Sequence, residues 1–203
     1  TGTSTRTQQS NRPVLRNMSE FNNPGGGCCI GSSKIHTIDG LIEASNIKKG
    51  DRVISYDTVV NDYTETIIDC VIKTKCYAGE ELLTKITSNL GTIITTPYHP
   101  IFKLNDKWYF PINHPNTVIT KNIKCDYIYT FVTQNRKSII VDGYIYATLG
   151  HNINGKCIYH NYFGSDKVIA DLKLFNDFSK GCITLTKDMF HRKGGLVYKI
   201  TSK

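Results

Sequence analysis

The sequence has 203 residues, enough for one good-sized domain or two small ones, and 39% of them are hydrophobic. Its 25 Lys and Arg outnumber 17 Asp and Glu, which gives a net charge of +8. The excess is scattered lysine rather than one dense block, so we expect no nucleic acid partner. No apolar run reaches membrane-spanning length and no signal peptide opens the chain, so we expect no membrane span.

The chain has seven cysteines, an odd number, and no two of them form a CxxC pair. This pattern indicates neither a complete disulfide framework nor a zinc knuckle, and it favours a reducing, cytoplasmic compartment. We expect no cofactor and no metal. A zinc site built from Cys125, His151, Cys157 and His160 stays open as an alternative, although nothing in the spacing favours it.

Residues 1–27 are rich in Thr, Ser, Gln, Asn, Arg and Gly, and their few apolar residues show no period. We predict a flexible upstream flank there. Further along, short runs rich in Ile, Val, Thr and Tyr alternate with turn signals. The predicted strands are Lys34–Thr37, Arg52–Tyr56, Thr66–Lys75, Leu82–Ser88, Thr92–Thr95, Ile101–Leu104, Lys107–Phe110, Tyr127–Thr133, Ser138–Val141 and Tyr144–Leu149. Such regular short strands predict an all-β domain.

The pattern changes after Gly150. Ser165 is a predicted N-cap for a helix over Asp166–Leu172, which has one apolar face. Leu196–Ile200 predicts a last strand. We therefore expect a domain over residues 28–150 and a C-terminal extension over 151–203 that contains one helix and packs on the domain. We also expect a monomer.

Three glycines, residues 25–27, run directly into Cys28. The Cys28 thiol can reach back to the carbonyl carbon of Gly27, because Gly27 has no side chain to block the approach. Glycines also adopt backbone angles closed to other residues, so a strained peptide bond can form here. The stretch fits a self-cleaving junction, but taken alone it favours a flexible linker that ends at a buried cysteine.

A second candidate group follows the predicted strand Thr92–Thr95. Thr96 stands three residues before His99, in a tight turn made by Pro97, so both polar side chains can point at one place. Histidine is the natural general acid near neutral pH and can protonate a departing amide nitrogen. Thr96 can hold the carbonyl or the amide by a hydrogen bond. The alternative is a proline-containing turn with a surface histidine.

Several short motifs, in this order, resemble the Hint superfamily, which contains hedgehog autoprocessing domains, inteins and bacterial intein-like domains. They are Gly27-Cys28-x-x-Gly31, Gly50-Asp51-Arg52-Val53 and Thr96-x-x-His99-Pro100. The chain is most similar to the Vint group, in which a Hint domain follows a von Willebrand A domain. The second half adds Val141-Asp142-Gly143, Thr148-Leu149-Gly150-His151 and His160-Asn161-Tyr162-Phe163-Gly164-Ser165.

The resemblance covers roughly residues 28–172 and implies an all-β, horseshoe-shaped Hint fold with pseudo-twofold symmetry. It also implies an N-to-S acyl shift, in which Cys28 attacks the Gly27 carbonyl to form a thioester. Water, a thiol or an amine then resolves the thioester, and the substrate is the chain's own upstream polypeptide. Thr96 and His99 match the Thr and His of the family motif. The motif spacing favours Cys28 over Cys29 as the nucleophile, although a swap of roles stays open.

Full protein splicing is not expected, because Ala147-Thr148 stands where splicing relatives carry a His-Asn pair. The pair His151-Asn152 comes later and is followed by Ile153, which has no nucleophile, so cleavage at Asn152 is the disfavoured alternative.

Three residues are candidate accessory groups. Asp69 lies near the place of a hedgehog aspartate, but we favour a plain strand residue. Cys70 is more readily a core thiol than a second acyl acceptor. His151 resembles a Vint feature. The whole-chain alternative is a cleavage-inactive, Hint-like interaction module, and a basic nucleic-acid binder would rest on charge alone.

Overall fold

The structure is a computed structural model that describes residues 27–103 and 107–202. The predicted flank therefore lies outside the described residues, except for Gly27. The strands are β1 (Cys29–Ile30), β2 (Lys34–Thr37), β3 (Gly40–Glu43), β4 (Arg52–Asp57), β5 (Asp62–Lys75), β6 (Glu80–Ser88), β7 (Gly91–Thr95), β8 (Ile101–Lys103), β9 (Lys107–Tyr109), β10 (Thr117–Lys124), β11 (Tyr127–Thr133), β12 (Ile139–Val141), β13 (Tyr144–Tyr146), β14 (Cys182–Leu185), β15 (Phe190–Lys193) and β16 (Leu196–Ile200). The α-helix α1 spans Asp166–Lys173.

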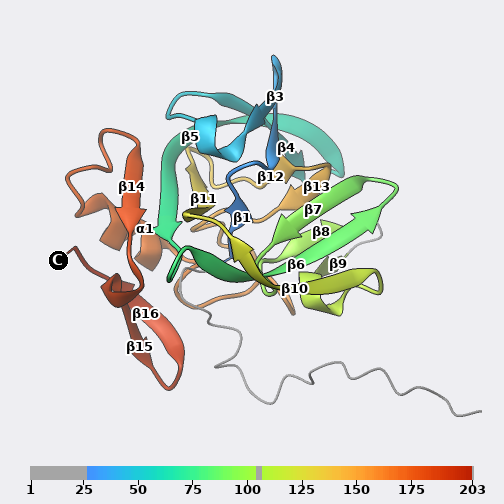
Figure 1. Ribbon diagram of the computed structural model, residues 1–203. Helices are drawn as coiled ribbons and strands as arrows, with labels where there is room; N and C mark the ends of the chain where they lie inside the picture. The colour runs from blue at the N-terminus through green and yellow to red at the C-terminus, as the bar shows by residue number, and fades with distance from the viewer. Residues whose placement is uncertain (1–26, 104–106, 203) are drawn as a thin grey trace, which may run out of the picture.

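One long sheet holds most of these strands, in the order β10-β6-β7-β1-β11-β5-β4-β2-β12-β13-β8-β9. Strand β3 pairs with β2, and β14 pairs with β5 in parallel. The sheet bends round on itself, so that the short strand β1 lies near the middle of the molecule (Figure 1). The prediction of an all-β fold with one short helix is confirmed.

The two largest differences between observed and predicted strand boundaries have visible reasons. Strand β5 begins at Asp62 rather than Thr66, because a hairpin pairs Asp62 with Asp57 of β4. Strand β13 ends at Tyr146 although an apolar run continues. The Ala147 carbonyl, which follows β13, accepts a hydrogen bond from the His99 side chain instead of from a neighbouring strand. The strands β1, β3, β10, β14 and β15 had no predicted counterpart.

Two hydrophobic cores lie on opposite faces of β5 and β11. Ile68 and Phe131 pack into the first core, which the bent sheet encloses. Cys70 and Val132 pack into the second, which the C-terminal segment covers. The consecutive apolar residues of these two strands are therefore explained by burial on both faces.

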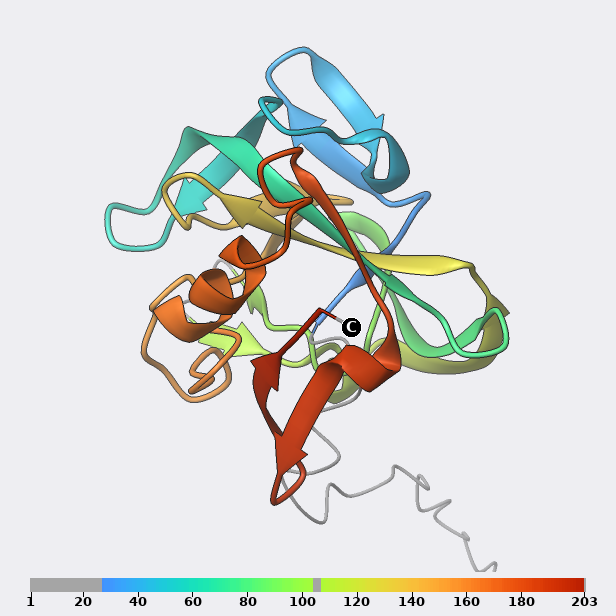
Figure 2. The same ribbon diagram turned by 90° about the vertical axis from the view of Figure 1, so that its left-hand side faces the viewer.

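The C-terminal segment, residues 151–202, packs on β5 in two ways: α1 joins the second core on its outer face, and β14 pairs with its edge in parallel (Figure 2). The predicted helix is confirmed, and the Ser165 side chain accepts a hydrogen bond from the Lys167 N–H as its N-cap. Val168, Ile169 and Leu172 form the buried helix face. None of the described helices is long and apolar enough to cross a membrane.

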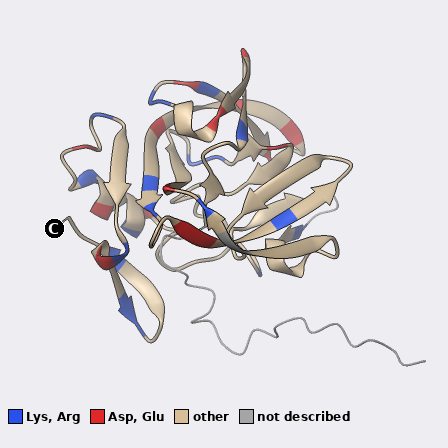
Figure 3. Cartoon of the chain, in the orientation of Figure 1, with Lys and Arg blue, Asp and Glu red and all other residues tan. Residues whose placement is uncertain are grey.

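Charged residues are spread over many elements. Lys and Arg are interspersed with Asp and Glu over the described ribbon (Figure 3). Several of them form exposed ion pairs, such as Lys34 with Glu43 and Arg52 with Glu65. The net positive charge is therefore distributed rather than gathered on one element.

Candidate functional site

Strand β1 carries the Gly27–Cys28 bond to the centre of the sheet. Cys29 pairs with Thr95 of β7 on one side and with Tyr129 of β11 on the other. Extending these antiparallel registers by one residue places Cys28 between Thr96 and Thr130. The strand order thus brings together segments that are far apart in the sequence.

Thr96 holds the nitrogen of the predicted scissile bond. The Cys28 N–H donates a hydrogen bond to Thr96 Oγ1 over 2.9 Å. The Cys28 carbonyl accepts from the Thr96 N–H and from Thr95 Oγ1, each at 2.9 Å. The backbone N–H and carbonyl of Cys28 are therefore both fixed by hydrogen bonds. The Thr96 hydroxyl oxygen lies beside the Cys28 nitrogen, which is the leaving group of the predicted cleavage.

His99 lies directly against Gly27. Its ring stacks on Tyr146 with centroids 3.5 Å apart and planes 12° apart. Its Nε2 lies 2.8 Å from the Ala147 carbonyl, which can only accept, so Nε2 carries the proton. In the neutral ring Nδ1 is then unprotonated, and it has no hydrogen bond of ordinary geometry to any described residue.

Burial controls the protonation of this ring. His99 is 3% exposed, and burial lowers its pKa to about 3, although the nearby Gly27 and Ala147 backbones favour the charged form. A neighbouring histidine, His151, lowers the pKa further. At neutral pH the ring is therefore neutral, with a free lone pair on Nδ1 that faces Gly27.

The contact between His99 and Gly27 leaves no room for a side chain. A Cβ built on Gly27 would lie 2.0 Å from His99 Nδ1 and 2.5 Å from His99 Cβ. The ring cannot easily retreat, because Tyr146 and the Ala147 carbonyl hold it.

We expect Gly27→Ala to slow any cleavage at the Gly27–Cys28 bond by roughly tenfold or more, since a small misplacement of reacting groups is costly. The cleavage rate measured by mass spectrometry checks this expectation. An alanine variant that is cut as fast as the wild-type chain would show that the contact plays no part.

The Cys28 side chain is fully buried. It packs with Cys76, Ile128 and Cys125, and the Sγ atoms of Cys76 and Cys125 are 3.0 Å apart. Burial, first of all, raises the pKa of the Cys28 thiol well above its usual value. The thiolate is therefore not populated at neutral pH, and a nucleophilic Cys28 must lose its proton during the attack.

Cys29 belongs to a different environment. It is also fully buried, but its side chain is part of the first core together with Ile35 and Phe131. Neighbouring residues of a strand point to opposite faces, which explains why the two thiols separate.

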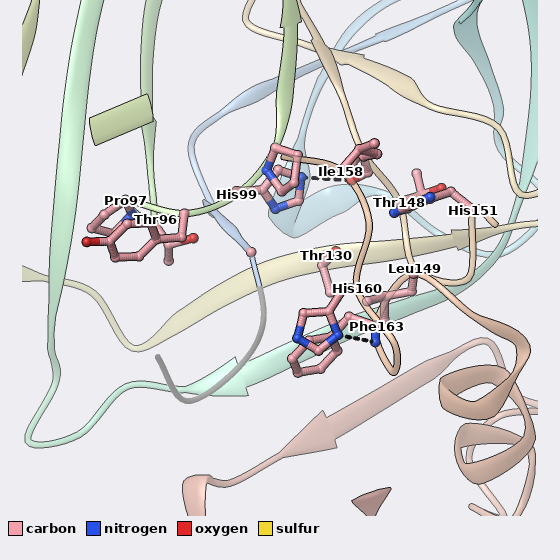
Figure 4. Close-up of a pocket in the computed structure, with 15 residues that line it drawn as sticks. Thr96, Pro97, His99, Thr130, Thr148, Leu149, His151, Ile158, His160 and Phe163 are labelled. Atoms are coloured by element: carbon pink, nitrogen blue, oxygen red, sulfur yellow. Dashed lines mark hydrogen bonds between the residues drawn. The ribbon is translucent and has the colours of Figure 1, made fainter. Parts of the chain in front are cut away.

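A cavity of about 50 Å³ opens beside Gly27. Figure 4 shows side chains from three parts of the chain around it: Thr96 and His99 follow β7, Thr130 belongs to β11, and the C-terminal segment supplies the other two histidines. Those two are His151 and His160. The cavity thus contains the predicted residues Gly27, Thr96, His99 and His151. It also contains His160, which the sequence analysis named only in a family motif and in the zinc alternative, and Thr130, which it did not select.

Backbone N–H groups fix the tautomers of His151 and His160. His151 Nδ1 accepts from the Ile153 N–H at 2.9 Å. His160 Nδ1 accepts from two backbone N–H groups, those of Tyr162 and Phe163, at 3.1 and 3.0 Å. The proton of each neutral ring is therefore on Nε2. Burial lowers the pKa of both rings to about 4.

We expect these three histidines to make the fold acid-sensitive. Between pH 6.5 and about 4 these histidines bind protons in the unfolded chain but stay neutral in the folded one. The free energy of unfolding therefore falls as the pH falls. The expected loss from pH 7 to pH 5 is about 2 kcal/mol for each histidine. Urea unfolding at the two pH values measures it. The variant His160→Asn keeps an acceptor for the two N–H groups and should reduce the pH dependence; an unchanged slope would contradict the assignment.

Two of the other candidates do not line the cavity. Asp69 faces Lys49 in a half-exposed ion pair of 3.8 Å. Cys70 is buried in the second core.

Asn152 is exposed, and its side-chain amide donates to Asp166 Oδ1 at 3.1 Å. Among residues 27–103 and 107–202, no cluster of three or more His, Cys, Asp or Glu could hold a metal ion.

Comparisons with known proteins agree with this architecture. The model of the Vint family of Hint domains matches residues 27–198. The solved bacterial intein-like domain from Clostridium thermocellum is 17% identical, with a TM-score of 0.53 over 60% of this chain and 98% of that one. A DnaB intein from Synechocystis sp. PCC 6803 is 12% identical, with a TM-score of 0.49 over 61% of this chain and 100% of that one. No curated protein matches the chain significantly. The family match covers most of the chain and begins at the predicted scissile bond, so this protein belongs to the Vint family of Hint domains.

Proposed function

We propose that the chain is a self-acting, single-turnover autoprocessing domain that cleaves its own Gly27–Cys28 bond through a thioester. The observation that supports this most strongly is the contact of an unprotonated imidazole nitrogen, His99 Nδ1, with Gly27, while Thr96 binds the adjacent Cys28 nitrogen. The upstream polypeptide that ends at Gly27 is the substrate.

The first step is an acyl shift from nitrogen to sulfur. Cys28 Sγ attacks the Gly27 carbonyl carbon, and its proton passes to His99 Nδ1, because the buried thiol cannot ionise beforehand. The ring is then cationic and donates to the Ala147 carbonyl through Nε2. Its Nδ1 proton moves to the Cys28 nitrogen as the C–N bond breaks. A carbon–sulfur bond replaces a carbon–nitrogen bond, and no proton is gained or lost.

Thr96 assists the departure of the nitrogen. In a planar amide the nitrogen lone pair is delocalised, so a leaving nitrogen must become pyramidal before it accepts a proton. The hydrogen bond from the Cys28 N–H to Thr96 Oγ1 fixes the direction of that N–H. The approach of the His99 proton from the cavity side is then compatible with the bond to Thr96.

A second candidate function is a cleavage-inactive interaction module of the same fold. The burial of the Cys28 thiol, which packs among Cys76, Ile128 and Cys125, favours it. In this case the junction would stay whole.

Hydroxylamine distinguishes the two functions, because it cleaves thioesters at neutral pH but leaves ordinary amides intact. We expect the full chain to give two fragments, one of them ending in a Gly27 hydroxamate. A chain that stays whole in hydroxylamine would contradict autoprocessing and support the interaction module.

A further inference from the structure

The chain contains a pair of cysteines that the acyl shift does not use: Cys76, which follows β5, and Cys125, which precedes β11. We propose that they form a redox-active dithiol site, in which Cys125 reacts first with a low-molecular-weight disulfide and Cys76 then closes an internal disulfide. The inference does not rest on the proposed autoprocessing. Both cysteines lie downstream of the Gly27–Cys28 bond, so they stay in one chain whether or not that bond is cut.

The sulfur atoms of the pair lie in direct contact. Cys76 Sγ and Cys125 Sγ are 3.0 Å apart, although the two residues are separated by 49 positions in the sequence. The sulfur–sulfur bond of a disulfide is about 2.05 Å long, so the two atoms need to approach by only about 1 Å. The folded chain thus brings together two thiols that an unfolded chain would keep apart.

Backbone hydrogen bonds hold both cysteines in place. The Cys76 N–H donates to the Asp126 carbonyl at 2.9 Å, which continues the antiparallel pairing of β5 with β11. The Cys125 N–H donates to the Gly79 carbonyl at 2.8 Å. The contact between the sulfur atoms is therefore a consequence of how the strands pair, rather than of a chance approach of two loops.

Cys125 is the more accessible of the two thiols. It is partly exposed and lines a surface pocket together with Gly31 and Tyr127. Cys76 is 4% exposed and does not line this pocket. A reagent that arrives from solution therefore meets Cys125 first, and Cys76 is placed behind it as the second thiol.

The ionisation of the two thiols supports the same order. Burial, first of all, raises the pKa of both, so we expect a slow reaction at neutral pH and a faster one at about pH 9. The hydrogen bond between the sulfur atoms raises the pKa of Cys76 further and lowers that of Cys125. The Cys76 S–H can therefore donate to an ionised Cys125, which is the thiolate that attacks.

The reaction needs one external oxidant, and a disulfide such as oxidised glutathione supplies it. The Cys125 thiolate attacks one glutathione sulfur, forms a mixed disulfide and releases a glutathione thiolate, which takes up the proton that Cys125 lost. Cys76 then attacks Cys125 Sγ, and its proton goes to the second glutathione as that leaves. Two cysteine thiols are oxidised to one disulfide, and one oxidised glutathione is reduced to two molecules of glutathione.

Peptide mapping with trypsin can identify this disulfide. Trypsin cuts after Lys75 and after Lys124, so each cysteine begins its own peptide, residues 76–85 and 125–136, and neither peptide contains a second cysteine. The folded full chain is incubated with oxidised glutathione, its remaining thiols are blocked with iodoacetamide, and it is digested without a reducing agent. The same treatment in urea shows what the unfolded chain does.

We expect a disulfide that joins these two peptides, about tenfold or more above any other linked pair, because contact in the folded chain makes the closing step intramolecular. In urea the preference should vanish. Cys76→Ser should stop at a glutathione adduct on Cys125, and Cys125→Ser should leave Cys76 unmodified. The matched control is Cys157→Ser, which removes a partly exposed cysteine outside this cluster and should keep the link.

The folded wild-type chain alone can overturn the proposal, so the outcome does not depend on how well a variant folds. Peptides 76–85 and 125–136 that stay unlinked would overturn it, and so would a different dominant pair, such as Cys28 with Cys76. A glutathione adduct on Cys76 in folded Cys125→Ser would overturn the order of attack on which the site is built. None of these results bears on cleavage at Gly27–Cys28.

Discussion

Cys28→Ala should abolish cleavage at the Gly27–Cys28 bond, with a loss of about a thousandfold or more. Without Sγ no thioester can form at this position, because the residue after Gly27 then carries no nucleophile. Intact mass spectrometry of the full chain, incubated with and without a small thiol, measures the loss. Cys28→Ser should retain a slow residual reaction, because the hydroxyl is a weaker nucleophile in the same position.

Cys29→Ala is the matched control for this variant. Its thiol lies in the first core, on the opposite side of the strand from the Cys28 side chain, so cleavage should continue within a few-fold of the wild-type rate. The change does remove a buried group, and urea unfolding would check that the fold survives. Loss of cleavage in folded Cys29→Ala, with cleavage retained in Cys28→Ala, would mean that the two thiols have exchanged roles.

His99→Ala should slow cleavage by about 10²–10⁴-fold, the range expected when a general acid–base group is removed. The ring that would carry the proton from sulfur to nitrogen is lost, while Cys28 and Thr96 keep their hydrogen bond. Added imidazole should restore part of the rate, because the deletion leaves a ring-sized space against Tyr146.

Recovery of cleavage by added imidazole distinguishes a proton-transfer role of His99 from a packing role. A purely structural role for His99 would respond to neither the concentration of imidazole nor its pKa. His36→Ala is the matched control, since His36 is a partly buried histidine of β2 that lies outside the cavity. A His99→Ala chain that is cleaved at the wild-type rate would contradict the proposed proton path.

The sequence was sufficient for the part of the site that depends on local spacing. Gly27 and Cys28 are neighbours, and Thr96 and His99 lie in one turn, so short motifs reveal them. The same holds for α1, where the Ser165 cap and the apolar face lie within nine residues of chain. Short β-rich runs between turn signals were likewise enough to predict the all-β fold.

The remaining residues of the site depend on pairing between distant strands. Thr130 is one threonine among many until the register of β1 with β11 places it opposite Cys28. In the sequence Tyr146 is an ordinary aromatic residue of a predicted strand, and only the tertiary fold stacks its ring on His99. The sequence indicates only a loop at His160, because the Tyr162 and Phe163 N–H groups meet its ring only when the loop is folded. Strand β10 was missed since its outward residues include apolar ones, such as Val118 at 60% exposure.

The most direct test of the central claim is the mass of the upstream fragment after the full chain is incubated with a small thiol. Attack of Cys28 on Gly27 predicts a fragment over residues 1–27 that carries the thiol as a thioester on its last residue, together with a partner that begins at Cys28. A chain that stays whole, or a fragment that ends elsewhere, would contradict the account.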